Sequence, residues 1–326
     1  MRSQEFIVSN LRNLSLDIYT VGYPNMGESV VSVICDGKTV LFTILTDCYT
    51  PENYNHVESL LNSLGVSHID VFIWTHPDKD HSVGICELLD KFDSKHEAWV
   101  YLPEGFYACD IPDCICEDSR NAIVYLKEHY NFSRKFNLIP VGVDEKETRS
   151  LIVIKFVEAY GTKSVHCRWQ FMAPFGSLVW RKISNGTDFV LNNLSIVYSM
   201  YFNDVNYLFC GDMSESMVKH IDDENFQNVR FIKIPHHGSD EPKSFLPKLK
   251  SMQVHNAMAV TTSFQNTHPK SNVLDGYKSI CEEVDCTGDN MHATKPYGCV
   301  KASFNIHSLI CHTEFSGNAF CYYKAK

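Results

Sequence analysis

A run of apolar residues followed by a short polar turn constrains this chain more than any other stretch. Residues 71–74, Val-Phe-Ile-Trp, are β-branched and aromatic, which is typical of a buried strand. The turn that follows carries metal-binding side chains within six residues, namely His76, Asp78, Asp80 and His81. Rigid scaffolds place chemistry in loops that follow strand ends. Imidazole with carboxylate suits zinc, manganese or iron, so the pattern predicts a metal site rather than a solvated loop.

Two later strand ends carry side chains of the same kinds. Asp212 follows an apolar run in a Gly-Asp turn, and His236 and His237 follow another. Because each loop comes after a predicted strand, all three loops can lie at one edge of packed sheets. A two-metal site needs a carboxylate that bridges the ions, and Asp212 is the natural bridge. Asp47 ends an earlier strand and is suited to orient a ligand histidine.

The length and charge of the chain limit its function. The chain has 326 residues, of which 44% are hydrophobic, so a sizeable core can form. Its formal net charge is -10. Proteins that coat nucleic acids are basic because they neutralise phosphates, so a general coat protein is not supported. A local basic groove or bound metal ions could still attract a phosphodiester.

The cysteine pattern predicts a reduced, cytoplasmic protein. The thirteen cysteines are an odd number and are scattered, unlike a disulfide framework. Residues 1–14 lack the apolar core of a secretory signal, and no apolar run is long enough to span a bilayer. We therefore expect no membrane association. The sequence does not fix the oligomeric state.

The order of the predicted elements repeats along the chain, with hairpins first and then strands alternating with helices. The first third predicts strands at 14–19, 30–35 and 40–45 and a helix at 52–64, before the strand at 71–74. The last third predicts a hairpin of 194–200 with 205–210, strands at 229–234, 258–262, 299–305 and 319–323, and helices at 214–220 and 273–282. This order predicts an α/β fold in which two mixed sheets pack face to face with helices outside.

The middle third is less regular. A strand is expected at 98–102, a helix at 122–130 and a strand at 151–157, with polar connections at 109–118 and 145–149. We interpret residues 103–188 as an elaboration of the first half rather than as a separate domain.

Together the motifs resemble the metallo-β-lactamase superfamily. The motifs that match are Asp47, His76–His81 with Asp78 where most members have His, Cys-Gly-Asp-Met at 210–213, and Ile-Pro-His-His-Gly-Ser at 234–239. With Asn-Asn-Leu-Ser-Ile-Val at 192–197 and His268-Pro269, they are similar to the soluble hydrolase domain of ComEC-type DNA-uptake proteins. This likeness covers roughly residues 17–287. It implies a four-layer αβ/βα sandwich formed by one domain, 1–326, with a family-specific elaboration at about 103–188.

The resemblance also implies a set of ligands. His76, Asp78 and Asp212 would hold one metal ion, and Asp80, His81 and Asp212 would hold the other with either His236 or His237. The cofactor would be one or two Zn²⁺ ions, with Mn²⁺ as the alternative. The usual histidine between the second motif and Asp212 has no clear match, because none of His96, His129 and His166 has a fitting context and Asn193 and Ser195 occupy the corresponding stretch.

The expected function is metal-dependent hydrolysis of a phosphodiester, with nucleic acid as the simplest substrate. A bound divalent ion lowers the pKa of its water from about 15.7 toward about 7, which gives a metal-bound hydroxide. Asp80 would orient or deprotonate the nucleophile, and His268 would donate to a phosphate or leaving group, or else cap a helix. The alternatives are hydrolysis of a small phosphoester or another ester, ring opening of a lactam or lactone, and a partner-binding or sensing module with a degenerate metal site. A protein partner encoded in the same operon is a further expectation.

Overall fold

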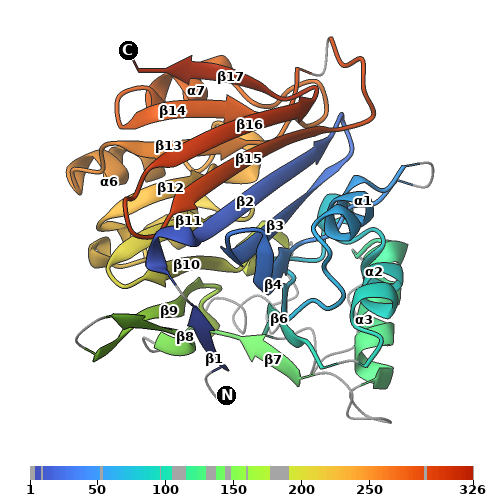
Figure 1. Cartoon of the computed structure of the whole chain (residues 1–326). Coiled ribbons are helices and arrows are strands. Elements are labelled where there is room, and N and C mark those ends of the chain that lie inside the picture. The colour runs from blue at the N-terminus through green and yellow to red at the C-terminus, as the bar shows by residue number, and fades with distance from the viewer. Residues whose placement is uncertain are drawn as a thin grey trace.

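The computed structural model is built around two β-sheets (Figure 1). It describes residues 4–8, 10–51, 54–95, 97–104, 115–129, 137–143, 148–158, 161–176, 191–289 and 292–325. Within these residues, no helix has both the length and the apolar character needed to cross a membrane.

The first sheet begins with a meander of three long antiparallel strands. Its strands are β2 (Leu14–Tyr23), β3 (Gly27–Asp36), β4 (Thr39–Thr46), β5 (Val71–Ile73), β6 (Trp99–Pro103), β7 (Asn137–Val141), β15 (Gly298–Asn305) and β16 (Cys311–Gly317). The spatial order is β16-β15-β2-β3-β4-β5-β6-β7. The turn between β3 and β4 uses Gly37, whose φ of 61° suits a tight reversal. From β4 to β7 the strands pair in parallel, so their carboxyl ends lie at one edge.

The second sheet repeats this plan. Its strands are β1 (Gln4–Val8), β8 (Thr148–Glu158), β9 (Gly161–Ala173), β10 (Val197–Phe202), β11 (Val205–Phe209), β12 (Val229–Lys233), β13 (Ala257–Thr261), β14 (Cys281–Cys286) and β17 (Phe320–Lys324). The spatial order is β1-β8-β9-β10-β11-β12-β13-β14-β17. Strands β8 to β11 pair antiparallel, whereas β11 to β14 pair in parallel.

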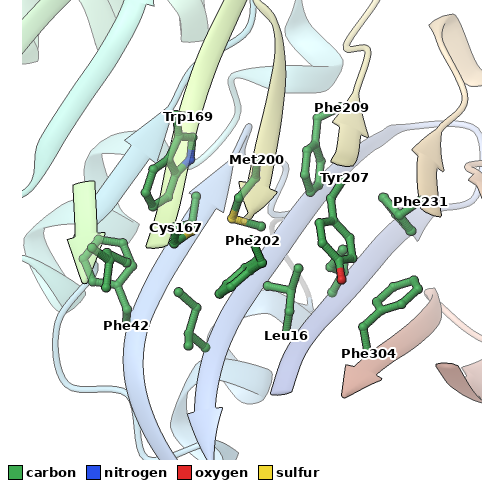
Figure 2. Close-up of a cluster of buried hydrophobic side chains, with 14 of the residues drawn as sticks. Leu16, Phe42, Cys167, Trp169, Met200, Phe202, Tyr207, Phe209, Phe231 and Phe304 are labelled. Atoms are coloured by element: carbon green, nitrogen blue, oxygen red, sulfur yellow. The ribbon is translucent and has the colours of Figure 1, made fainter. Parts of the chain in front are cut away.

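An apolar core fills the space between the two sheets. Figure 2 shows Trp169 and Phe42, from opposite sheets, in this core with other large side chains. The Phe42 and Trp169 rings lie 5.9 Å apart, and Tyr198 stacks on Phe209 at 4.7 Å. Burial of such rings is a main favourable contribution to folding. The cluster holds the two sheets face to face.

Helices cover the outer face of each sheet. The helices are α1 (His56–Ser63), α2 (Ile85–Phe92), α3 (Glu117–Glu128), α5 (Glu215–Val218), α6 (Phe245–Ser251) and α7 (Ser271–Tyr277). Phe72 of β5 points outward and packs with residues of α1, α2 and α3, and Ile232 of β12 packs with residues of α5, α6 and α7. Their strand neighbours point into the central core. The predicted α/β class, with two packed mixed sheets and helices outside, is confirmed (Figure 1).

The structure corrects several predicted elements. The helix expected at 273–282 ends at Tyr277, and Cys281–Cys286 forms strand β14. In β14 the apolar Val284 faces the helices while its polar neighbours face the other way, which a helical interpretation could not anticipate. The connections expected at 109–118 and 145–149 are shorter, because α3 begins at Glu117 and β8 at Thr148, while 109–114 and 145–147 lie outside the described residues. Strands β1, β7, β9 and β16 and helix α6 were not predicted.

Candidate metal centre

The candidate site forms where strands of both sheets end. Strand β4 leads into Asp47 and β5 into the turn with His76, while β11 leads to Asp212 and β12 to the His236-His237 pair. Strands β4 and β5 pair in parallel in one sheet, and β11 and β12 pair in parallel in the other. The carboxyl ends of parallel neighbours meet at one edge, so the two sheets bring these loops together across the core.

The backbone at the site is strained. Asp47, His236 and His237 have positive φ angles of 57°, 48° and 51°. Such left-handed conformations cost roughly 1–3 kcal/mol each for residues with a side chain, and they persist where surrounding contacts enforce them. Gly211, at φ 49°, permits close approach, because a Cβ there would lie 2.4 Å from the hydroxyl of Ser195. Left-handed backbone also occurs at turn residues elsewhere, such as Asn203 and Asn228, but at the site it falls on three residues that the sequence picks out.

Asp212 lies between two buried histidines. Its Oδ2 is 3.8 Å from Nε2 of His76, and its Oδ1 is 3.5 Å from Nε2 of His81. The three side chains offer ligand atoms within 4.8 Å of one another. Within the described part of the chain, Nε2 of both histidines and Oδ1 of Asp212 are buried without a hydrogen-bond partner. Buried polar atoms are rarely left unpaired, and this set fits a divalent cation.

Hydrogen bonds orient His76 and His81 so that both Nε2 atoms are available. Asp47 Oδ2 lies 2.8 Å from Nδ1 of His81 and also accepts the hydroxyl hydrogen of Thr75 at 2.7 Å. Since that hydroxyl has given its hydrogen to Asp47, it can only accept from Nδ1 of His76, 3.0 Å away. Both imidazoles therefore carry a hydrogen on Nδ1. Asp47 does orient a histidine of the site, as predicted.

His237 is supported in the same way by residues from both sheets. The Thr262 hydroxyl donates to Glu28 and lies 2.7 Å from Nδ1 of His237, so it accepts from that nitrogen. Glu28 Oε2 is 3.2 Å from the same nitrogen and 2.8 Å from Nζ of Lys233. Nε2 of His237 then faces Asp80 Oδ2 at 3.1 Å, where two acceptors meet unless a proton or a cation lies between them.

The two adjacent histidines serve different sides of the site. His237 joins Asp80 and His81 in one group of ligand atoms. His236 instead places Nε2 3.7 Å from Asp212 Oδ2, the oxygen that faces His76. Its Nδ1 lies 3.2 Å from the Ser239 hydroxyl, which donates to a carbonyl and so accepts here. Asp78 completes this side, with Oδ2 3.3 Å from Nε2 of His76.

Mutual charges dominate the titration of the cluster. Burial is the largest influence on Asp212 and would raise its pKa, but His81, His237 and His76 together outweigh it and hold the pKa below the usual range. Burial would likewise lower the pKa of His237, yet Glu28, Asp80 and Asp212 together raise it to about 9. For Glu28, burial is outweighed by Lys233, His237 and His81 together, which hold its pKa well below normal. Asp212 and Glu28 are therefore negatively charged. A proton and a metal cation would compete for the same Nε2 lone pairs of the histidines.

The other residues that the sequence singled out lie either at the edge of this centre or away from it. The ring of His268 lies 6.0 Å from that of His236, at the edge of the site. His129 and His166 contact Tyr125 and Ser164 instead of the site, and His96 lies outside the described residues. Ser195 accepts the Asp212 backbone N–H at 2.9 Å, and Asn193 accepts from Ser214 and Ser216.

Several functional neighbours were missed by the sequence analysis. Glu28, Thr75 and Thr262 support the histidines, and Lys233 holds Glu28. Thr75 could have been noticed, because it directly precedes His76 at a strand end. Glu28 and Thr262 carry no local signal, since their contact joins residues far apart in the chain.

Comparisons with known proteins add a distant structural likeness. No family model matches the chain, and no curated protein matches it in sequence. The structure is similar to the crystal structure of human tRNase Z, short form, with a TM-score of 0.40 and 15% sequence identity, covering 77% of this chain and 93% of that chain. A functional assignment therefore depends on the site itself.

Proposed function

We propose that the chain is a metal-dependent hydrolase of phosphodiesters, with nucleic acid as the simplest substrate. The observation that supports this most directly is the position of Asp212 between His76 and His81, with both Nε2 atoms and a carboxylate oxygen buried and without a hydrogen-bond partner in the described residues. A structural polar network would satisfy these atoms internally. Here the surrounding hydrogen bonds keep them available.

The donors divide into two sets that share Asp212. His76, Asp78, Asp212 and His236 would hold one ion, and Asp80, His81, Asp212 and His237 would hold the other. In this proposal His236 takes the place of the histidine that the family motif lacks. Imidazole and carboxylate donors suit Zn²⁺ first and Mn²⁺ second.

Divalent ions in such a centre lower the pKa of water and stabilise negative charge on phosphoryl oxygens. Asp80 is placed to hold the proton of an attacking water at Oδ2, which lies 3.4 Å from Nε2 of His81. His268, beside His236, is placed to donate to a phosphate oxygen or a leaving group. The nearby Lys79 pairs with Asp118 at 4.0 Å, and the net charge of the chain is -10. The proposal therefore assigns phosphate attraction mainly to the bound metal ions.

Metal analysis combined with a cleavage assay tests this function. The purified chain should contain zinc or manganese and should cleave DNA, RNA or a bis-aryl phosphodiester. Asp80→Asn, which removes the proton-transfer group, and His81→Ala, which removes a metal ligand, should each lower the rate at least ~100-fold. His292→Ala is the matched control, because this histidine is 77% exposed and lies outside the centre.

The outcomes separate the alternatives. Full activity in both site variants would rule out the mechanism. A chain that binds metal but leaves every phosphodiester intact, while cleaving a small carboxylic or phosphate monoester, would keep the metal centre and replace the substrate class. A metal-binding chain that cleaves none of these substrates would indicate a sensing or partner-binding role.

A further inference from the structure

A second group of metal-type side chains lies on the two strands at one edge of the second sheet. Glu283 and Asp285 are on β14 and Cys321 is on β17, and none of the three belongs to the centre described above. Their ligand atoms, two carboxylate oxygens and a thiol sulfur, lie within 4.8 Å of one another. The fold brings them together from segments more than thirty residues apart.

The sheet geometry explains this convergence. Glu283 and Asp285 are two residues apart on a strand, so their side chains point to the same face, opposite to Val284. Asp285 pairs directly with Cys321 across the antiparallel ladder, next to a shift in register. Directly opposed residues of antiparallel strands project side by side, so the thiol and the carboxylates share one face.

Asp285 is the independent sign that this group is more than an acidic patch. Its side chain is completely buried. Leaving aside the Cys321 thiol of the same group, neither carboxylate oxygen has a hydrogen-bond partner among the described residues. Glu283 by contrast pairs with Lys324 at 2.8 Å. A buried carboxyl group without partners is costly, and a bound ion is one of the few arrangements that explain it.

We propose that Glu283, Asp285 and Cys321 form a second metal site, which binds a thiophilic divalent cation such as Zn²⁺. A thiolate with two carboxylates favours zinc-like ions over Mg²⁺ or Ca²⁺, which prefer oxygen ligands alone. The exposed position of Cys321 leaves a way in for the ion and room for water as a further ligand. Lys324, beside Glu283, offsets part of the negative charge of the three ligands.

Binding would connect the C-terminal strand to the sheet. Strand β17 pairs only with β14 among the described strands and lies at the sheet edge, where strands fray most easily (Figure 1). A metal bridge from Cys321 to β14 would hold β17 in register. The role is structural, and it does not depend on the proposed hydrolase activity.

Titration with Cd²⁺ tests this site separately, because the thiolate–cadmium bond gives an ultraviolet charge-transfer absorption. Among the described residues, the groups of ligands in the main centre contain no cysteine, so Cd²⁺ bound by them does not contribute to this signal. The full chain should gain the absorption on titration. Cys321→Ser and Asp285→Asn should each lose most of it or require at least ~10-fold more Cd²⁺, the loss typical of removing one metal ligand. Cys86→Ser, which changes a partly exposed cysteine on α2, should leave it unchanged.

Three results would overturn the proposal. One is a wild-type chain that shows no absorption. Another is an absorption that survives in Cys321→Ser, which would place the cation on other cysteines. The third is loss in Cys321→Ser but not in Asp285→Asn, which would indicate an exposed thiol that captures Cd²⁺ alone. If Asp285→Asn does not fold, Glu283→Gln takes its place, because Glu283 supplies the other carboxylate of the group, and the comparison with Cys321→Ser is the same.

Discussion

Glu28 and Lys233 form an almost completely buried ion pair, 2.8 Å long, beneath His237. Breaking such a pair from one side leaves an uncompensated charge in the interior, which costs about 3–5 kcal/mol. Glu28→Gln should therefore lower the free energy of unfolding by about that amount. The double variant Glu28→Gln with Lys233→Met should recover much of the lost free energy of unfolding, because neither residue of the pair then leaves an uncompensated buried charge. Urea denaturation in the presence of a chelator measures both, and strictly additive losses would contradict this account of the pair.

Asp47 should control metal affinity without contacting the metal. Its carboxylate accepts from Nδ1 of His81 at 2.8 Å and from the Thr75 backbone N–H at 2.7 Å. In Asp47→Asn, the amide can satisfy Thr75 but then turns its NH₂ toward the nitrogen that must carry a hydrogen. Affinity for zinc should fall roughly 10- to 100-fold, the usual effect of losing such a partner. Competition with a chromophoric chelator measures it.

Asp17→Asn is the control for this variant. Asp17 lies in the same sheet but contacts Ser303 and Lys301 instead of the histidines. Its substitution should leave zinc affinity unchanged. Equal affinities of the Asp47 variant and the wild-type chain would show that Thr75 alone can orient the two histidines.

The adjacent histidines should be separable by metal content. His236 approaches Asp212 Oδ2 from the side of His76, and His237 lies with Asp80 and His81. In a two-ion centre, His236→Ala and His237→Ala should each remove about one ion per chain, and the double variant should remove more than either. Elemental analysis after dialysis measures this. The same metal content in His236→Ala and in the wild-type chain would leave that histidine without a role as a ligand.

The predictable parts of the molecule are those with local signals. Short β-branched runs and tight turns predicted the central strands and the two-sheet class, and strand-end loops predicted the residues that meet around Asp212. The predicted helix at 273–282 includes only the first two residues of β14, and the rest of this strand has too few apolar residues to show the alternation of a half-buried strand. Strand β16 is an exposed, polar edge strand, so it lacks the alternation that reveals a half-buried strand.

The supports of the centre could not be predicted for a different reason. Glu28 is a single acid at the start of β3, and its role depends on its contacts with Thr262 and Lys233, which belong to the other half of the fold. A sequence pattern within one segment contains no information about a partner more than two hundred residues away. The division of His236 and His237 between two sides of Asp212 likewise depends on the left-handed backbone at both residues.

Asp70 should make stability depend on pH independently of the metal centre. Its Oδ2 accepts the Thr43 backbone N–H at 2.8 Å, and burial raises its pKa to about 6. An unfolded aspartate titrates near pH ~3.9, so the folded state binds more protons between that pH and 6. Stability from this group is therefore greatest below pH ~4 and declines as the pH rises to about 6, above which the loss is constant.

The variant Asp70→Asn keeps a side-chain oxygen that accepts the Thr43 hydrogen bond, but it removes the titrating carboxyl group. The variant should match the wild-type chain near pH ~4 and exceed its free energy of unfolding by about 3 kcal/mol at pH ~7. Urea denaturation across this range measures the difference, and a difference that does not change with pH would show that the carboxyl group titrates normally.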